Sequence, residues 1–122
     1  MNTKTPYQSR VKEWLLACFG LEIATDKVER NHRFIEEAIE LVQATGCTKS
    51  EVLQLVDYVY GRDIGEVKQE VGGVMVTLAG LCEAQGIQLD ECAETELELV
   101  WTKVEKIRAK QKAKPKYGPL PS

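Results

Sequence analysis

Apolar residues recur every three or four positions along most of this chain, which is the spacing of an amphipathic helix rather than of a strand. In the first such stretch they are Val11, Trp14, Leu15 and Cys18. Gly20 follows them as a stop signal. The expected helices run from Tyr7 to Phe19, from after Thr25 to before Gly46, from after Thr48 to about Tyr60, from after Asp63 to about Gln85, and from Asp90 into the lysine-rich segment.

Residues that commonly cap helix N-termini precede four of these stretches. The oxygen of such a side chain accepts a hydrogen bond from a backbone N–H of the first turn. Thr48 and Glu51 have the spacing of a capping box, in which each side chain accepts a hydrogen bond from the other's backbone N–H. The expected caps are Thr25, with Asp26 in the first turn, Thr48, Asp63, with Glu66 three residues later, and Asp90.

The pattern therefore predicts an all-α fold, a bundle of four or five helices. The one β-branched run, residues 74–77, lies inside a stretch of helical spacing. No repeat or linker divides the chain, so we expect residues 1–114 to form a single domain. Residues 115–122 contain three prolines and a glycine, which favour an extended or disordered tail. Because 122 residues bury only a modest core, we expect dimerisation to complete it.

Composition excludes several classes of protein. With 43% hydrophobic and 29% charged residues the chain is globular, and a net charge of −3 gives no global reason to expect nucleic acid. The four cysteines include no CxxC pair and the one histidine is far from them in sequence, so we expect reduced core thiols rather than zinc ligands. The first ten residues are polar and no apolar run approaches the ~20 residues of a membrane span, so we expect a cytoplasmic protein without a membrane partner.

Three glutamates, Glu36, Glu37 and Glu40, lie within five residues of the second expected helix. Glu37 and Glu40 share a helix face and repel each other by roughly a few tenths of a kcal/mol. A hard divalent cation offsets this repulsion, since carboxylate oxygens are its preferred ligands. The alternative is a solvated helix face on which Arg33 pairs with Glu37. Apolar residues 38, 39, 41 and 42 place the acids beside the buried stripe, which favours the metal site.

The fourth expected helix carries a second acidic pair. Glu66 and Glu70 are four residues apart, and Gly72 and Gly73 follow them. Each glycine inside a helix costs roughly 1 kcal/mol relative to alanine, so an adjacent pair indicates close packing or room for a ligand. Acidic pairs on two neighbouring helices are a common source of ligands for metals in helix bundles.

Three segments together resemble the MazG-like all-α nucleoside triphosphate pyrophosphohydrolases. Residues 33–42, RFIEEAIELV, are similar to the EExxE helix of that family, and residues 70–78, EVGGVMVTL, lie where the family has its ExxD helix. Residues 101–110, WTKVEKIRAK, resemble its basic final helix. The resemblance implies a homodimer or homotetramer that uses magnesium, or manganese, to hydrolyse an NTP or dNTP to the monophosphate and pyrophosphate.

The resemblance also implies a role for each acid. By motif position, Glu37, Glu40 and Glu70 would bind the metal, and Glu36 would orient or deprotonate the attacking water. The family's motif aspartate is replaced by Gly73. One explanation is that another acid supplies the missing oxygen; the candidates are Glu66, Glu94 and Glu98. Alternatively water or substrate completes the site, or the chain is a catalytically impaired helical interaction or regulatory module.

Four further residues are candidates for binding the substrate. Lys103 and Lys106 lie on one face of the last expected helix and would stabilise charge on the phosphates. Arg33 would bind a phosphate or form a salt bridge with Glu37 and Glu40. His32 would contact the nucleotide or tune Glu36. For the lysines and the histidine the alternative is a structural role, and nucleic acid is not an expected partner because aromatic residues are not interleaved with the basic ones.

Overall fold

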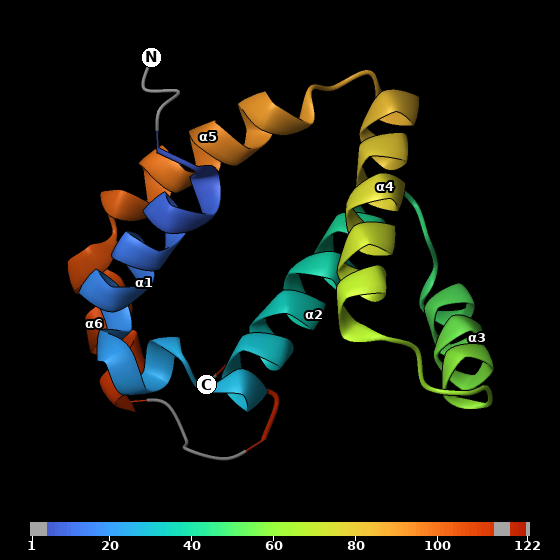
Figure 1. The fold of residues 1–122 in the computed structure, drawn as a ribbon, viewed down its shortest axis with the longest axis horizontal. Coiled ribbons are helices and arrows are strands. Elements are labelled where there is room, and N and C mark those ends of the chain that lie inside the picture. Colours follow the sequence, from blue (N-terminus) through green and yellow to red (C-terminus); the bar gives the residue numbers. More distant parts are fainter. Residues whose placement is uncertain (1–4, 114–117, 122) are drawn as a thin grey trace. The chain divides into compact units, whose positions relative to one another are not determined.

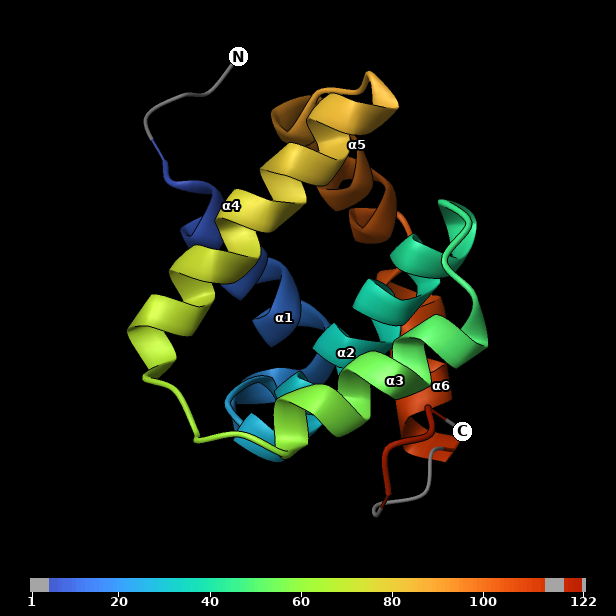
Figure 2. The same ribbon diagram turned by 90° about the vertical axis from the view of Figure 1, so that its right-hand side faces the viewer.

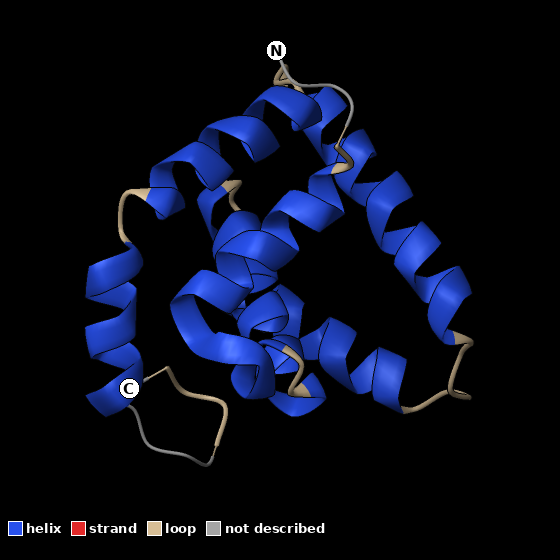
Figure 3. Cartoon of the chain, turned by 60° about the vertical axis from the view of Figure 1, so that its left-hand side comes forward, coloured by secondary structure: helices blue, strands red, loops and turns tan. Residues whose placement is uncertain are grey.

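The computed structural model describes residues 5–113 and 118–121, and these form an all-helical fold without strands (Figures 1 and 3). The prediction of an all-α protein is confirmed for this part of the chain. The helices are α1 (Tyr7–Ala24), α2 (Lys27–Ala44), α3 (Lys49–Tyr60), α4 (Val67–Gln85), α5 (Leu89–Trp101) and α6 (Val104–Ala113). None of these described helices is long and apolar enough to cross a membrane.

The helices group into two compact units, which we describe separately. The first consists of Met1–Leu41 and Leu97–Ser122, so it holds α1, most of α2, the end of α5 and α6. The second is Val42–Glu96, which holds α3, α4 and most of α5. The predicted single domain over residues 1–114 stays a prediction.

The first unit is built on the packing of α1 against α6, which lie side by side in Figure 1; Figure 2 shows the chain turned by 90°. Arg108 of α6 donates from Nε to the carbonyl oxygen of Ala17 in α1 at 2.8 Å. Trp14 donates from its indole nitrogen to the carbonyl oxygen of Val100 at 3.1 Å, which satisfies the polar atom of a partly buried ring. The Cys18 thiol is buried here, and burial raises its pKa while the nearby Arg108 lowers it.

In the second unit, local sequence signals set the ends of α3 and α4. Thr48 and Glu51 form the predicted capping box: the Glu51 N–H donates to Thr48 Oγ1 at 3.2 Å, and the Thr48 N–H donates to Glu51 Oε1 at 2.8 Å. Gly86 ends α4 in the left-handed region, with φ of 69°, as a glycine can without strain. Cys82 is buried in this unit, so the prediction of core thiols is confirmed for Cys18 and Cys82, whereas Cys47 is half-buried and Cys92 is exposed.

Two helix starts differ from the prediction by a few residues. Asp26, rather than Thr25, caps α2, because its Oδ1 accepts from the N–H groups of Val28 at 3.0 Å and Glu29 at 3.2 Å. Glu66, rather than Asp63, caps α4, as described with the site below. In both cases the cap lies immediately before the first helical residue, where its oxygen reaches the first-turn N–H groups.

The last expected helix is in fact two helices, so six rather than five are present in the described residues. α5 begins at Leu89, which places Asp90 in its first turn rather than at its cap. The helix ends at Trp101, where Thr102 donates from Oγ1 to the Leu99 carbonyl at 2.6 Å. Earlier in the chain, α1 breaks at Gly20 as predicted, with φ of 76°, but it resumes and continues to Ala24.

Candidate functional site

Helix α2 positions the three glutamates of the acidic cluster on consecutive turns. Its N-terminus is held by the Asp26 cap, and the helix runs without interruption to Ala44. Glu36 is half-buried, whereas Glu37 and Glu40, three residues apart, are exposed. The sequence prediction that these acids share one helix is confirmed, and the side chains of Glu37 and Glu40 reach solvent.

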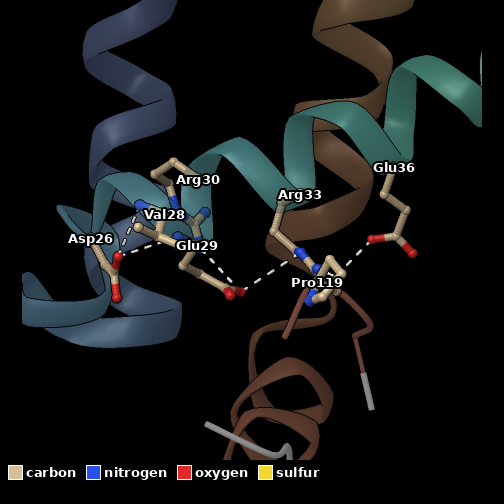
Figure 4. A network of polar contacts seen from close by, with 7 residues as sticks. All are labelled: Asp26, Val28, Glu29, Arg30, Arg33, Glu36 and Pro119. Carbon is tan, nitrogen blue, oxygen red and sulfur yellow. Dashed lines mark hydrogen bonds and ion pairs between the residues drawn. The ribbon is translucent and has the colours of Figure 1, made fainter. Parts of the chain in front are cut away.

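Arg33 is the link between this cluster and its surroundings (Figure 4). Its Nη1 lies 3.4 Å from Glu36 Oε1, and its Nε lies 3.7 Å from Glu29 Oε2. Its Nη2 donates to the carbonyl oxygen of Pro119, in the C-terminal segment. Arg33 therefore holds the carboxylate of Glu36, the predicted catalytic residue, and at the same time binds a segment far away in sequence.

A second arginine, Arg30, lies one turn before Arg33 and was not singled out from the sequence. Its Nη2 is 3.7 Å from Glu29 Oε2, and its Cζ is 5.1 Å from the centre of the Phe19 ring. Burial lowers the pKa of Arg30, and the neighbouring Glu29 acts in the opposite direction. The i,i+3 spacing of the two arginines is visible in the sequence, but the Phe19 contact needs the packing of α1 against α2 and is not.

The acids on α2 suit a hard cation by their chemistry, since all their donor atoms are carboxylate oxygens. Across the described residues, however, no group of three or more His, Cys, Asp or Glu side chains has the arrangement of a metal site. Glu37 and Glu40, one turn apart on α2, would supply at most two protein ligands from this helix. Magnesium commonly keeps several waters and is bound by one or two carboxylates plus substrate phosphates, so the donor set fits this ion.

Glu70, the third predicted metal ligand, lies in the first turn of α4, in the second unit. Its carboxylate lies against Gly65, so closely that a Cβ at that glycine would meet Oε2. Glu66, one of the candidates for the missing oxygen, uses both of its carboxylate oxygens to cap α4. Oε2 accepts from the Lys68 N–H at 2.9 Å and Oε1 from the Gln69 N–H at 3.1 Å.

The glycine pair of α4 is not explained by close packing. A Cβ at either Gly72 or Gly73 would meet no atom within 4 Å beyond the local backbone. The Gly73 carbonyl accepts a hydrogen bond from Thr77 Oγ1 at 2.9 Å, which is compatible with any residue at position 73. A residue other than glycine at position 73 would therefore have room for its Cβ.

The predicted phosphate-binding lysines do not lie on one helix face. Lys103 lies in the turn before α6, where its carbonyl accepts from the Ile107 N–H at 2.9 Å, and Lys106 lies inside α6. Both side chains are exposed. His32, also predicted to contact substrate, is half-buried on α2, one turn before Glu36. The structure places Lys103, Lys106 and His32 in the first unit, together with the acidic cluster.

Comparison with protein-family models, with curated proteins and with solved structures finds no match for the chain in any of the three.

Proposed function

We propose that the protein is a metal-dependent nucleotide pyrophosphohydrolase that cleaves an NTP or dNTP to the monophosphate and pyrophosphate. The observation that carries the proposal is the Arg33–Glu36 ion pair on α2, immediately beside Glu37 and Glu40. An arginine that orients one carboxylate next to two solvent-accessible carboxylates is a suitable arrangement for binding a cation and its phosphate ligand together.

Each residue has a distinct role in the proposed reaction. Glu37 and Glu40 bind magnesium or manganese, and Glu36, held by Arg33, accepts the proton of the attacking water. The metal supplies charge neutralisation at the phosphate oxygens. Lys103 and Lys106 stabilise the pyrophosphate leaving group, and His32 contacts the nucleotide. Glu70 lies in the second unit, and its role as a ligand is only what the resemblance implies.

The decisive experiment measures pyrophosphate release from a panel of NTPs and dNTPs, with and without magnesium or manganese. Glu37→Gln keeps the size of the side chain and removes its charge, so it is expected to lower kcat/KM about 100-fold or more, since metal charge stabilisation supplies several kcal/mol. Glu83→Gln, an exposed position on α4, is the matched control and is expected to retain activity. If no nucleotide is turned over by a normally folded wild-type protein, the alternative of a catalytically impaired regulatory module replaces this proposal.

The proposal also includes self-association, because many apolar side chains of α3 and α4 are exposed in a single copy of the chain. The exposed residues are Leu53, Leu55, Val56, Tyr58, Val59 and Tyr60 of α3, with Val67, Val71, Val74, Met75 and Val76 of α4. On α4 four of them recur at the helical period, and on α3 they surround the helix, as in helices that are buried.

A second copy of this chain is the occupant that fits these helices. Each of these eleven side chains exposes on the order of 100 Å², so together they expose on the order of 1,000 Å². A standard protein–protein interface buries about 800 Å² on each partner. A two-fold dimer covers the same surface on both copies at once. The choice between homodimer and homotetramer, and the cytoplasmic location, stay predictions.

A further inference from the structure

Two neighbouring guanidinium groups on α2 have hydrogen-bond donors without acceptors. Nε and Nη2 of Arg30, and Nε and Nη1 of Arg33, are shielded from solvent and have no hydrogen-bond partner within the described structure. A buried donor without an acceptor destabilises the fold, and more so when the group is charged. Four such atoms on adjacent turns form one cluster, because Arg30 and Arg33 are three residues apart.

The neighbouring carboxylates balance the charge of this cluster but not its hydrogen bonds. Glu29 lies 3.7 Å from each arginine, and Glu36 lies 3.4 Å from Arg33. Charge-assisted N–H···O bonds are shorter, at about 2.7–2.9 Å, and need alignment along the N–H direction. The donors therefore lack acceptors at hydrogen-bonding distance, and a compact group with several oxygens would supply them.

Two contacts hold the arginines in place. The Arg30 guanidinium is 5.1 Å from the centre of the Phe19 ring, a cation–π distance that restricts the rotation of its plane. Arg33 Nη2 donates to the carbonyl oxygen of Pro119, so the chain's own C-terminal segment already supplies one oxygen acceptor to the cluster (Figure 4). A peptide carbonyl is the acceptor that an anion's oxygen would replace.

We propose that Arg30 and Arg33 form a binding site for phosphate or pyrophosphate groups, in which the Pro119 carbonyl occupies one donor until the anion displaces it. Guanidinium groups match phosphate geometry through paired N–H donors, which lysine does not offer. The inference rests on the proposed function for the source of the anion, the phosphate chain of a nucleotide. It adds Arg30 as a binding residue and the segment 118–121 as a competitor for the site.

The test uses inorganic pyrophosphate as the probe and calorimetry in the absence of any divalent metal. Wild-type protein is expected to bind pyrophosphate, and Arg30→Lys and Arg33→Lys are each expected to weaken binding about tenfold, since each loses a paired donor but keeps its charge. Arg62→Lys is the control, because Arg62 is exposed in the second unit. Equal binding by all four proteins, or no binding by wild type, would overturn the site.

A chain that ends at residue 117 tests the competition. Without the Pro119 carbonyl, Arg33 Nη2 is available, so pyrophosphate is expected to bind several-fold more tightly than to the full chain. Unchanged or weaker binding would overturn the competitor role of the segment. This variant leaves every helix intact, so it does not depend on the folding of the arginine variants.

Assays of metal-dependent turnover on the same arginine variants, run beside the metal-free titrations, separate this inference from the proposed activity. Orthophosphate and a dNTP, titrated in parallel, show which source of the phosphate group the site prefers. If pyrophosphate binding depends on the arginines but no metal-dependent turnover is detected, the proposed function is contradicted and the anion site is still supported.

Discussion

Arg33 of α2 donates a hydrogen bond to the carbonyl of Pro119, which lies 86 residues further along the chain. The same guanidinium is ion-paired with Glu36, so one side chain joins the proposed catalytic base to the C-terminal segment. This relationship makes Arg33 the residue whose replacement is most informative about the first unit.

Replacing Arg33 with lysine is expected to lower kcat/KM for nucleotide hydrolysis about tenfold or more. Lysine keeps the charge but has a single nitrogen, so it cannot hold Glu36 and the Pro119 carbonyl together. Steady-state kinetics with magnesium, with circular dichroism to verify helix content, measure the effect. The exposed Arg62→Lys is the control, and an Arg33→Lys enzyme with wild-type kinetics would show that the ion pair has no part in catalysis.

Replacing Gly73 with aspartate is expected to raise magnesium affinity and turnover several-fold. A Cβ at this position meets nothing within 4 Å, so the first atom of the new side chain has room. The substitution restores the acid of the ExxD pattern one turn after Glu70. The control is Gly72→Asp, which adds the same acid and the same small gain in helix propensity at the adjacent position. Equal effects of the two substitutions would remove the argument that position 73 belongs to the metal site.

The capping box of α3 is expected to stabilise the fold less as the solution becomes acidic. The pKa of Glu51 lies below its ordinary value of 4.5, first because the Thr48 backbone N–H donates to its carboxylate and then because the Thr48 hydroxyl does. Because the carboxyl pKa is lowered in the folded state, its stabilising contribution is fully present when the pH is above the ordinary pKa of the group. This contribution is lost as the pH falls through the lowered pKa of the folded state.

Urea unfolding of wild type and Glu51→Gln between neutral and acid pH measures this contribution. The difference between the two proteins is expected to be largest near neutrality and to shrink on acidification. Thr48→Ala, which removes the other half of the box, is expected to cost about 1 kcal/mol at neutral pH. A difference between wild type and Glu51→Gln that grows on acidification would contradict the assignment.

The apolar surface of α3 and α4 is expected to be the site of self-association. A charge in that surface, as in Leu55→Asp or Val71→Asp, would be buried without a partner in the dimer, so the variants are expected to be monomers by light scattering. Leu21→Asp, at an equally exposed apolar position on α1, is expected to leave the oligomer intact. Wild-type protein that is monomeric at micromolar concentration would contradict the proposal directly.

Local features of the fold were predictable from the sequence because their causes lie within a few residues. The Thr48–Glu51 box and the left-handed Gly86 each depend on one turn of helix. The break between α5 and α6 was missed because residues 101–104 contain no glycine or proline, and the Thr102 hydroxyl that satisfies a helix-end carbonyl is an ambiguous signal.

Long-range relationships were not predictable from periodicity. The sequence placed Arg33 beside the acids but suggested Glu37 and Glu40 as its partners, whereas the structure pairs it with Glu29 and Glu36. Its contact with Pro119 joins segments that share no local pattern, and the Phe19–Arg30 contact depends on how two helices pack. The metal roles of Glu37, Glu40 and Glu70 stay predictions, as does the predicted tail, of which residues 115–117 and 122 lie outside the described residues.

Phosphorus NMR of a dNTP incubated with protein and magnesium identifies the bond that the protein breaks. The deoxynucleoside monophosphate and pyrophosphate are expected to appear together, at a rate that Glu37→Gln reduces and Glu83→Gln does not. Formation of the diphosphate and orthophosphate, or an unchanged triphosphate spectrum with folded wild-type protein, would contradict the proposed reaction.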